Sequence, residues 1–503
     1  MTPSGVYKTL PPTGLFFWCL QDSRVVPTRK KVLFMNARRV DMLNGNIVVN
    51  MIAFTIPVIL TNLLALLYNA ADLVVVGNFA SPAAFAAVGA TGALTNLFVT
   101  LFVGISTGGC ICVAQYYGAH DGKNVSQTVH TCVLMSILGG LALAVIGCVF
   151  CKPVLLMMGT PEEIVDMSTR YMRIMFVCQP FNILYNFISG ILRATGDTKR
   201  PFVIMAFTGA LNVVLNLVFV IVFHMDVDGV GYATLIGGVV NCVIGGRILL
   251  NSDDSIRVNI KELHIYRDKL VKVLAYGIPS GLQGALFSLS NVIIQSAVNT
   301  LSVVGVNIGG HIVSGVSVVG GNSASSGIEG FIYMAMNSVS QAGLNFAGAN
   351  YGARQYKRVD RTLLSGIGIV FVTGVVMCGG ALLFRVPLLR LYQPIDADAV
   401  LYGMQRGNVI FCTYMLCGMY EVLSNSLRGI GSSWTPMIVS VVTVGLVRIM
   451  WVLFVFPRFL TPFMLYISWP LTWIASIVLL TIAYQTMKKR LFAKNEAQYA
   501  KAS

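Results

Sequence analysis

Charged side chains are scarce in this sequence. Asp, Glu, Lys and Arg make up 11% of the 503 residues, and only 20 residues are acidic. A soluble domain normally carries about 25% charged residues, so a soluble globular protein is excluded. Apolar residues reach 56%, and the mean hydropathy is +0.75. The chain is therefore expected to be an integral membrane protein that crosses the bilayer many times.

Motifs of common enzymes and pumps are also missing. There is no H-E-x-x-H metalloprotease motif and no G-x-x-x-x-G-K-[ST] nucleotide loop, which argues against a membrane-embedded zinc enzyme and an ATP-driven pump. The five His have no spacing suited to a metal site. Most of the eleven Cys lie in apolar segments, where a small packing residue is the usual role. We therefore expect no enzymatic activity, no cofactor and no structural metal.

Long apolar segments are what the sequence has in abundance. A helix needs roughly 20 apolar residues to cross a bilayer. Segments of that kind lie at about 47–76, 84–114, 125–150, 164–192, 201–223, 229–250, 270–300, 328–349, 362–384, 399–427, 435–457 and 460–486. They are apolar on all sides, whereas membrane barrel strands alternate apolar and polar residues. The predicted fold is an all-α polytopic membrane protein with about twelve transmembrane helices.

The basic residues show how this fold lies in the membrane. The net charge is +15, and 27 of the 35 Lys and Arg fall in the tails and inner turns if the N-terminus is inside. Four lie in outer turns: Lys152, Arg385, Arg390 and Arg458. The remaining four lie within helices: Arg170, Arg173, Arg406 and Arg448. This asymmetry predicts that both termini are cytoplasmic. No basic helix outside the membrane carries stacking aromatics, so no nucleic-acid partner is expected.

Three motifs occur twice in the chain at nearly one spacing. They are "YGAHDGKNV" at 117–125 and "YGARQYKRV" at 351–359, "LLMMGTPEE" at 155–163 and "LLRLYQPID" at 388–396, and "LRATGDTKRP" at 192–201 and "LRGIGSSWTP" at 427–436. Pro57 and Pro279 correspond in the first helix of each half. The chain is therefore predicted to form two homologous six-helix lobes. Because six is even, both lobes enter the membrane from the same side, and a ligand is expected between them.

The repeat also sets the expected boundaries. They are a basic N-terminal tail at 1–40, an N-lobe at 41–250, a cytoplasmic linker at 251–268, a C-lobe at 269–487 and a cytoplasmic C-terminal tail at 488–503. The N-terminal tail has no apolar run long enough to cross a membrane, so it is expected to be disordered, and residues 1–34 are a candidate start-site artefact. About eleven extra residues lie between the seventh and eighth helices, within the uncharged stretch 300–327. We expect an apolar outer loop there, or extensions of the two helices.

Asp72 is the only charged residue between Ala53 and Val76. A carboxylate in hydrocarbon costs several kcal/mol unless it is paired, protonated or hydrated, so a functional role is expected. The alternative is a hydrogen bond to a neighbouring helix. Asn212 and Asn216 are four residues apart and share one helix face. Their amides can bind a protonated acid or a cation, or else only join helices.

The order of these motifs resembles the MATE family of multidrug and toxic compound extrusion transporters. The resemblance covers about residues 42–487 and rests on the paired prolines, on "YGA" after the second helix of each half, and on "LR(A/G)xG" after the fourth. It implies a monomer in the plasma (inner) membrane that exports organic, often cationic or amphipathic, small molecules. Export would be driven by antiport of H⁺ or Na⁺, with rocking of the two lobes and with Pro57 and Pro279 as hinges.

The resemblance also implies roles for single residues. Asp72 is the N-lobe carboxylate that binds the coupling proton or sodium ion, with Asn212, Asn216 and Thr234 beside it. Tyr171 and Ser189 are weaker candidates for the same cavity. Some members of the family carry a second acid where this chain has Asn216. A relay of two carboxylates is therefore in doubt, and the choice between H⁺ and Na⁺ stays open.

Polar residues in the C-lobe follow helical spacing. The predicted stripes are Gln283, Asn291 and Gln295 in the seventh helix, and Asn337, Gln341 and Asn345 in the eighth. They line a cavity or join helices. Glu421 and Arg448 are predicted to form a structural ion pair, with a role in transport as the alternative, and Glu329 is predicted to cap the outer end of the eighth helix. "GISTG" at 104–108 predicts close packing of two helices through small residues.

A lipid-linked oligosaccharide flippase of the same superfamily is the main alternative function. Such a protein would need several cations in its cavity to hold pyrophosphate. By helix position, Arg448 is the only deeply placed cation in this sequence. This favours cationic or neutral amphiphiles over anionic lipid headgroups.

Overall fold

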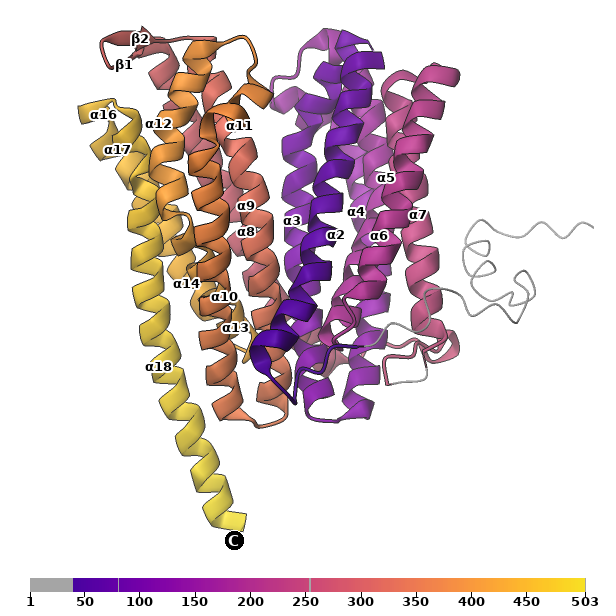
Figure 1. Ribbon diagram of the computed structural model, residues 1–503. Coiled ribbons are helices and arrows are strands. Elements are labelled where there is room, and N and C mark those ends of the chain that lie inside the picture. The colour runs from indigo at the N-terminus through magenta and orange to yellow at the C-terminus, as the bar shows by residue number, and fades with distance from the viewer. Residues whose placement is uncertain (1–38, 80, 253–254, 503) are drawn as a thin grey trace, which may run out of the picture.

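The structure, a computed structural model, describes residues 39–79, 81–252 and 255–502. Nearly all of these residues are helical, and the helices form two bundles side by side (Figure 1). The N-terminal tail predicted at 1–40 lies almost wholly outside the described residues.

The first bundle holds six long helices joined by short turns. They are α2 (Ile47–Phe79), α3 (Pro82–Gly118), α4 (Gly122–Met157), α5 (Glu162–Ala194), α6 (Lys199–Leu217) continued by the π-helical η2 (Val218–Val222), and α7 (Asp226–Leu250). The turns set where the helices begin: the Ser81 side chain accepts a hydrogen bond from the backbone N–H of Ala84, and Asp121 does the same for Asn124.

The second bundle follows a linker that contains the 3₁₀ turn η3 (Ile260–Glu262). It comprises α8 (Arg267–Val304), α9 (Val316–Gly352), α10 (Tyr356–Leu383), α11 (Arg385–Tyr392), α12 (Ala397–Thr413), α13 (Met415–Gly429), α14 (Trp434–Ser440), η4 (Val441–Val447), α15 (Arg448–Met450), η5 (Trp451–Val455), α16 (Phe456–Phe459), α17 (Pro462–Tyr466) and α18 (Ser468–Ala502). Several of these pieces run on from one another, so this bundle also crosses the membrane six times.

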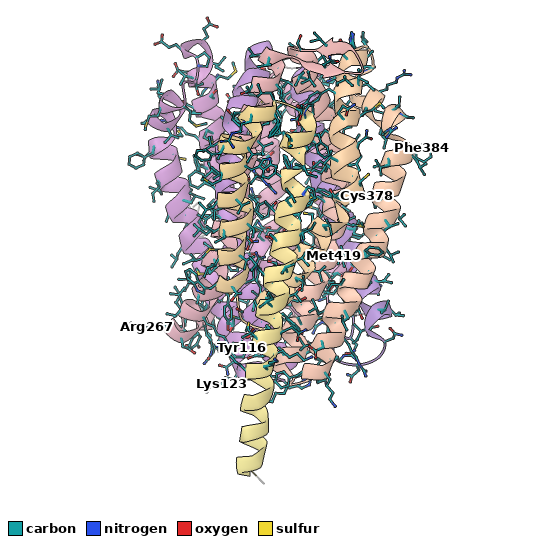
Figure 2. The ribbon with its side chains drawn as sticks, turned by 90° about the vertical axis from the view of Figure 1, so that its left-hand side faces the viewer. Tyr116, Lys123, Arg267, Cys378, Phe384 and Met419 are labelled. Carbon is teal, nitrogen blue, oxygen red and sulfur yellow. The ribbon has the colours of Figure 1, made fainter. Side chains whose placement is uncertain are left out.

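Ten helical segments of the described chain are long and apolar enough to span a membrane. The other two crossing segments are α9 and the consecutive helices α12 and α13, which carry many of the polar side chains described below. The two-lobe architecture of about twelve helices is thus confirmed. Tyr116, Lys123 and Arg267 lie toward the end of the bundle from which α18 projects, and Phe384 lies toward the other end (Figure 2). We call the first the inner end and the second the outer end.

The extra segment between the seventh and eighth crossings forms a β-hairpin. Strands β1 (Val306–Ile308) and β2 (His311–Val313) pair antiparallel at the outer end (Figure 1). Gly309 and Gly310 make the two-residue turn, with φ of 62° and 90°, as a hairpin of this length requires. The helices on both sides are lengthened, as one of the two sequence interpretations expected. The strands themselves were not predicted.

The α2 helix packs on both bundles. Near its start, Met51 and Phe54 contact Phe346 of α9, and the two Phe rings lie edge to face with centroids 5.8 Å apart. Near its end, Val75 and Val76 pack in a cluster with residues of α5, η2 and α7. Pro57 lies between these two regions, inside the helix. Because Pro cannot donate the backbone hydrogen bond of a regular helix turn, it weakens α2 at the point where the helix passes from one bundle to the other.

Candidate functional site

A cavity of about 680 Å³ lies between the two bundles. Its walls come from α3 and α5 on one side and mainly from α8, α9 and α13 on the other. Amide side chains line much of it: Asn62, Asn186, Gln283, Asn291, Asn337, Gln341, Asn345 and Asn425. The volume falls in the range of sites for small organic ligands, about 300–1,000 Å³.

Glycine residues bring the bundles into contact toward the inner end. A Cβ atom on Gly104 of α3 would lie 2.1 Å from the Cα of Gly281 of α8, and one on Gly108 would lie 2.6 Å from the N of Gly277. We call these four residues the glycine seam. The packing role predicted for "GISTG" is confirmed. Because α3 ends and α8 begins at the inner end, the seam holds the cavity closed on that side.

Side chains add polar contacts between the bundles. Asn62 donates to the Ser338 hydroxyl at 3.0 Å, and Gln115 donates to the backbone carbonyl of Gly429 at 2.8 Å. Near Gln115, a Cβ on Gly118 would meet the carbonyl oxygen of Ala349 at 1.9 Å. All of these contacts lie in the middle or at the inner end of the helices, so they reinforce the closure made by the seam.

Residues 39–46 tie the two bundles together at the inner end, and we call this segment the inner clasp. The Val40 N–H donates to the Gly196 carbonyl of the first bundle at 3.0 Å. From the second bundle, the Asn350 amide donates to the Met42 carbonyl at 3.0 Å, and Arg358 donates to the carbonyls of Asn44 and Gly45 at 2.9 and 3.0 Å.

Asp41 stabilises the turn of the clasp. Burial raises the pKa of its carboxyl, but hydrogen bonds from the backbone N–H groups of Asn44 and Leu43 outweigh this effect, and the pKa is lowered overall. The carboxylate form that holds the turn is therefore the form present at neutral pH.

Asp72 lies in the outer half of α2, in contact with α6. The side-chain amide of Asn216 donates to the Asp72 carboxylate at 2.5 Å and to the side-chain oxygen Oδ1 of Asn212 at 3.0 Å. The Asn212 amide in turn donates to the Tyr68 hydroxyl at 3.1 Å. Thr234 of α7 lies beside both Asp72 and Tyr68. The four residues that the sequence grouped are thus brought together. Tyr68, one helix turn before Asp72, was missed, although its i, i−4 spacing would have revealed it.

This cluster contains oxygen atoms that could bind a cation. The side-chain carbonyl oxygen of Asn216 is buried and has no hydrogen-bond partner among the described residues, and the buried hydroxyl of Thr234 lies beside the Asp72 carboxylate. Together with the Asp72 carboxylate they form a set of hard oxygen donors, the kind that a small cation such as Na⁺ prefers. The same carboxylate can instead take a proton and stay hydrogen-bonded to the Asn216 side chain. The donor set therefore fits either ion.

The other predicted site residues divide into two groups. Gln283, Asn291, Asn337 and Gln341 line the central cavity, as does Asn345. Three others do not reach it. Tyr171 packs in the apolar cluster around Val75 and Val76. Ser189 is buried next to Gly190, which does line the cavity. Gln295 is hydrogen-bonded to Asn299 and Asn322, nearer the outer end.

The predicted ion pair between Glu421 and Arg448 is wrong. Both residues line the cavity, but no ion pair joins them in the described part of the chain. Arg448 lies between the π-helical segments η4 and η5, which change the direction of side chains around the helix. Its guanidinium donates to Thr472 at 3.0 Å and lies 4.9 Å from the centre of the Trp469 ring.

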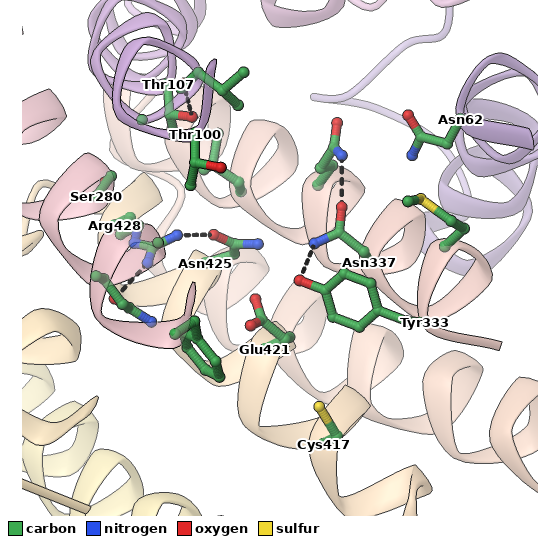
Figure 3. Close-up of a pocket in the computed structure, with 18 of the residues that line it drawn as sticks. Asn62, Thr100, Thr107, Ser280, Tyr333, Asn337, Cys417, Glu421, Asn425 and Arg428 are labelled. Atoms are coloured by element: carbon green, nitrogen blue, oxygen red, sulfur yellow. Dashed lines mark hydrogen bonds between the residues drawn. The ribbon is translucent and has the colours of Figure 1, made fainter. Parts of the chain in front are cut away.

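A different ion pair joins Glu329 of α9 to Arg406 of α12. Both side chains are largely buried, at 15% and 5% exposure. Glu329 therefore does not cap a helix end, as the sequence suggested, because it lies well inside α9. The carboxylate of Glu421, by contrast, points into the cavity and has no hydrogen-bond partner among the residues drawn (Figure 3).

Two further arginines line the cavity. Arg193 donates to Gln341 at 2.8 Å. Arg428 donates to Asn425 at 2.7 Å (Figure 3) and to Gln283 at 2.5 Å. They occupy equivalent positions in the two copies of "LR(A/G)xG". Both were predicted to lie in inner turns, with Arg448 as the only deep cation. This prediction is wrong, because Arg193 and Arg428 each lie in the last turn of a helix and line the cavity.

The model of the MatE family matches residues 57–218 and 279–453, once in each bundle. The chain belongs to the MatE family. This MatE protein is a multi-pass membrane transporter and not an enzyme. The double match also agrees with the internal repeat of its sequence.

Known relatives cover most of the MatE chain. The "Probable multidrug resistance protein YoeA" of Bacillus subtilis (strain 168) is 27% identical over 454 residues, which are 88% of this chain and 94% of that protein. The "FAD transporter" of Shewanella oneidensis is 20% identical over 388 residues, 76% of this chain and 82% of that one.

Solved structures show the same fold. An outward-facing multidrug resistance MATE family transporter of the MOP superfamily superposes with a TM-score of 0.83 at 20% identity, covering 91% of this chain and 99% of that one. A MATE in complex with MaL6 gives a TM-score of 0.79 at 22% identity, covering 92% of this chain and 100% of that one.

Proposed function

We propose that this protein exports organic amphiphiles, such as drugs, toxins or metabolites, across the plasma membrane by antiport with H⁺ or Na⁺. The observation that carries the proposal is the Asp72 cluster, an isolated carboxylate with oxygen donors beside it on a helix that packs on both lobes. The naming of a curated relative as a probable multidrug resistance protein supports the assignment.

In the proposed cycle, the coupling ion acts through α2. A proton or Na⁺ at Asp72 neutralises the carboxylate and changes what the Asn216 amide can donate to. The outer half of α2 then repacks against α6 and α7, and Pro57 lets it bend relative to the inner half, which packs on the C-lobe. Moving one charge across 100 mV supplies about 2.3 kcal/mol, which can drive this change.

The glycine seam and the inner clasp have to open for the cavity to face the other side. Both lobes then rock about their shared contacts, with Pro57 and Pro279 as the flexible points of α2 and α8. With the basic turns in the cytoplasm, both termini are cytoplasmic, and the state described here is open toward the outside. The chain works as a monomer, because each lobe supplies one wall of the same cavity.

A flippase for lipid-linked pyrophosphate is the second candidate function. The observation that favours it is the presence of Arg193, Arg428 and Arg448 in one cavity, since guanidinium groups bind phosphate well.

The test uses purified protein in proteoliposomes, with proton and sodium gradients imposed separately. Ethidium, a cation, and 1-naphthyl phosphate, an anion, serve as transported probes. One of the two gradients is expected to drive accumulation, and Asp72→Asn to abolish it while leaving probe binding intact. Lack of accumulation under both gradients for every probe would overturn antiport.

A further inference from the structure

The central cavity carries an excess of positive charge. Three arginines line it, Arg193, Arg428 and Arg448, and the acidic residues that line it are Glu329 and Glu421. Glu329 is already paired with Arg406, which lies behind the cavity wall. Glu421 alone is left to balance three guanidinium groups.

These arginines are held by neutral groups. Arg428 and Arg448 are 9% and 2% exposed, and their hydrogen bonds go to amide and hydroxyl oxygens. The Nε atom of each is buried without a partner, and within the described chain no ion pair involves either residue or Arg193. A buried cation without a counter-ion is costly. The cost is removed if an anion enters the cavity, because guanidinium groups bind carboxylate and phosphate with two parallel hydrogen bonds.

The repeat places one of these arginines in each lobe. Arg193 belongs to the N-lobe and donates across the boundary to Gln341 of α9, while its equivalent Arg428 belongs to the C-lobe. An anion held by both would contact both lobes at once. It would compete with Gln341 and Gln283 for these guanidinium groups, so its binding is linked to the relative position of the lobes. Phe287 lies one helical turn from Gln283, and Tyr333 accepts a hydrogen bond from Asn337, so these two rings give the cavity an aromatic wall on the side of the arginines.

We propose that the cavity binds an organic anion, with its carboxylate or phosphate between Arg193 and Arg428 and its apolar body against Phe287 and Tyr333. This inference rests on the transport function proposed above and names its substrate class. It replaces the expectation of cationic or neutral substrates, which rested on the family resemblance and on Arg448 being the only deep cation. A soluble organic acid and the phosphate of a lipid share this chemistry.

Binding to the unmodified protein in lipid nanodiscs tests the proposal by calorimetry with three matched probes. These are 1-naphthyl phosphate, the neutral 1-naphthol and the cationic 1-naphthylmethylamine. A hydrogen bond to a charged group corresponds to roughly tenfold to a hundredfold in affinity. The phosphate is therefore expected to bind at least about tenfold more tightly than the other two. Equal or tighter binding of the amine would overturn the proposal.

Variants locate the anion. Arg193→Gln and Arg428→Gln should each weaken 1-naphthyl phosphate about tenfold or more and leave 1-naphthol unchanged, whereas Arg458→Gln, at an exposed position outside the cavity, should change neither. Arg428→Lys keeps the charge without the two-pronged geometry and serves if the Gln variant does not fold. Unchanged phosphate binding in folded variants at both positions would refute the site.

A competition experiment shows whether the natural anion is a lipid or a soluble acid. Nanodiscs that contain a polyprenyl diphosphate should block 1-naphthyl phosphate if a lipid is the natural ligand, and should not if it is a soluble acid. The test is independent of ion coupling. Arginine-dependent anion binding without gradient-driven transport would keep this site and reject antiport. Gradient-driven export of ethidium without anion binding would support antiport and refute the anion site.

Discussion

The glycine seam gives a direct way to perturb the closed inner end. In Gly104→Ala the new Cβ would lie 2.1 Å from the Cα of Gly281, whereas ordinary van der Waals contact begins at 3.4 Å. The atoms in the way belong to backbone, so no side-chain rotation relieves the clash, and α3 and α8 must separate. Overpacking of this kind costs about 1–3 kcal/mol. Because the clash exists only while the seam is closed, the population should shift about fivefold to 150-fold toward the state open at the inner end.

Distances between spin labels measure that shift. Spin labels are placed at Lys123→Cys and Lys357→Cys, one exposed position on each lobe near the inner end. Double electron–electron resonance should then show a larger population of long label-to-label distances in Gly104→Ala. Gly368→Ala is the matched control, because a Cβ there meets nothing within 4 Å and both changes raise helix propensity equally. An unchanged distance distribution in a folded Gly104→Ala protein would refute the view that the seam closes the inner end.

Three other expectations concern charge and topology. Glu329→Gln should lower the free energy of unfolding by about 3–5 kcal/mol, because it leaves Arg406 buried without its partner, and adding Arg406→Met should restore much of it. Thermal unfolding checks this, and Glu421→Gln should have a much smaller effect. Arg358→Gln should speed proteolysis at the inner clasp. In the unmodified protein the rate of that cleavage should be constant from pH 5 to 8. Because the pKa of Asp41 is lowered, its carboxylate keeps the stabilising charge throughout this range and loses it only in more acidic solution than an ordinary aspartate does. A reporter fused after residue 490 should read cytoplasmic, and an external reading would invert the topology.

Local spacing predicted that Asn212 and Asn216 share one helix face and that Gly104 and Gly108 pack closely, whereas the family resemblance grouped the two amides with Asp72 and Thr234. Asn212 and Asn216 share a face because four residues make about one helical turn, and the same rule puts Gly104 and Gly108 side by side. Which helix each face meets depends on tertiary packing, so the partners Gly277 and Gly281 were not predicted.

The C-lobe charges could not be predicted in this way. Counting residues gives the depth of Glu421 and Arg448 in the membrane but not the direction of each side chain, and the π-helical turns around Arg448 direct it toward Trp469. Arg193 and Arg428 were missed because a residue at the end of an apolar run looks like part of a turn. Both are in fact in the last helical turn, and both line the cavity.

The central claim is that Asp72 couples an ion gradient to transport. Its most direct measurement is uphill accumulation of 1-naphthyl phosphate and of ethidium in proteoliposomes containing the unmodified protein or Asp72→Asn, alongside exchange of the same probes without a gradient. We expect Asp72→Asn to lose accumulation under both proton and sodium gradients but still to bind the probes in the cavity, because Asp72 does not line it. Accumulation by Asp72→Asn at the rate of the unmodified protein would contradict the account.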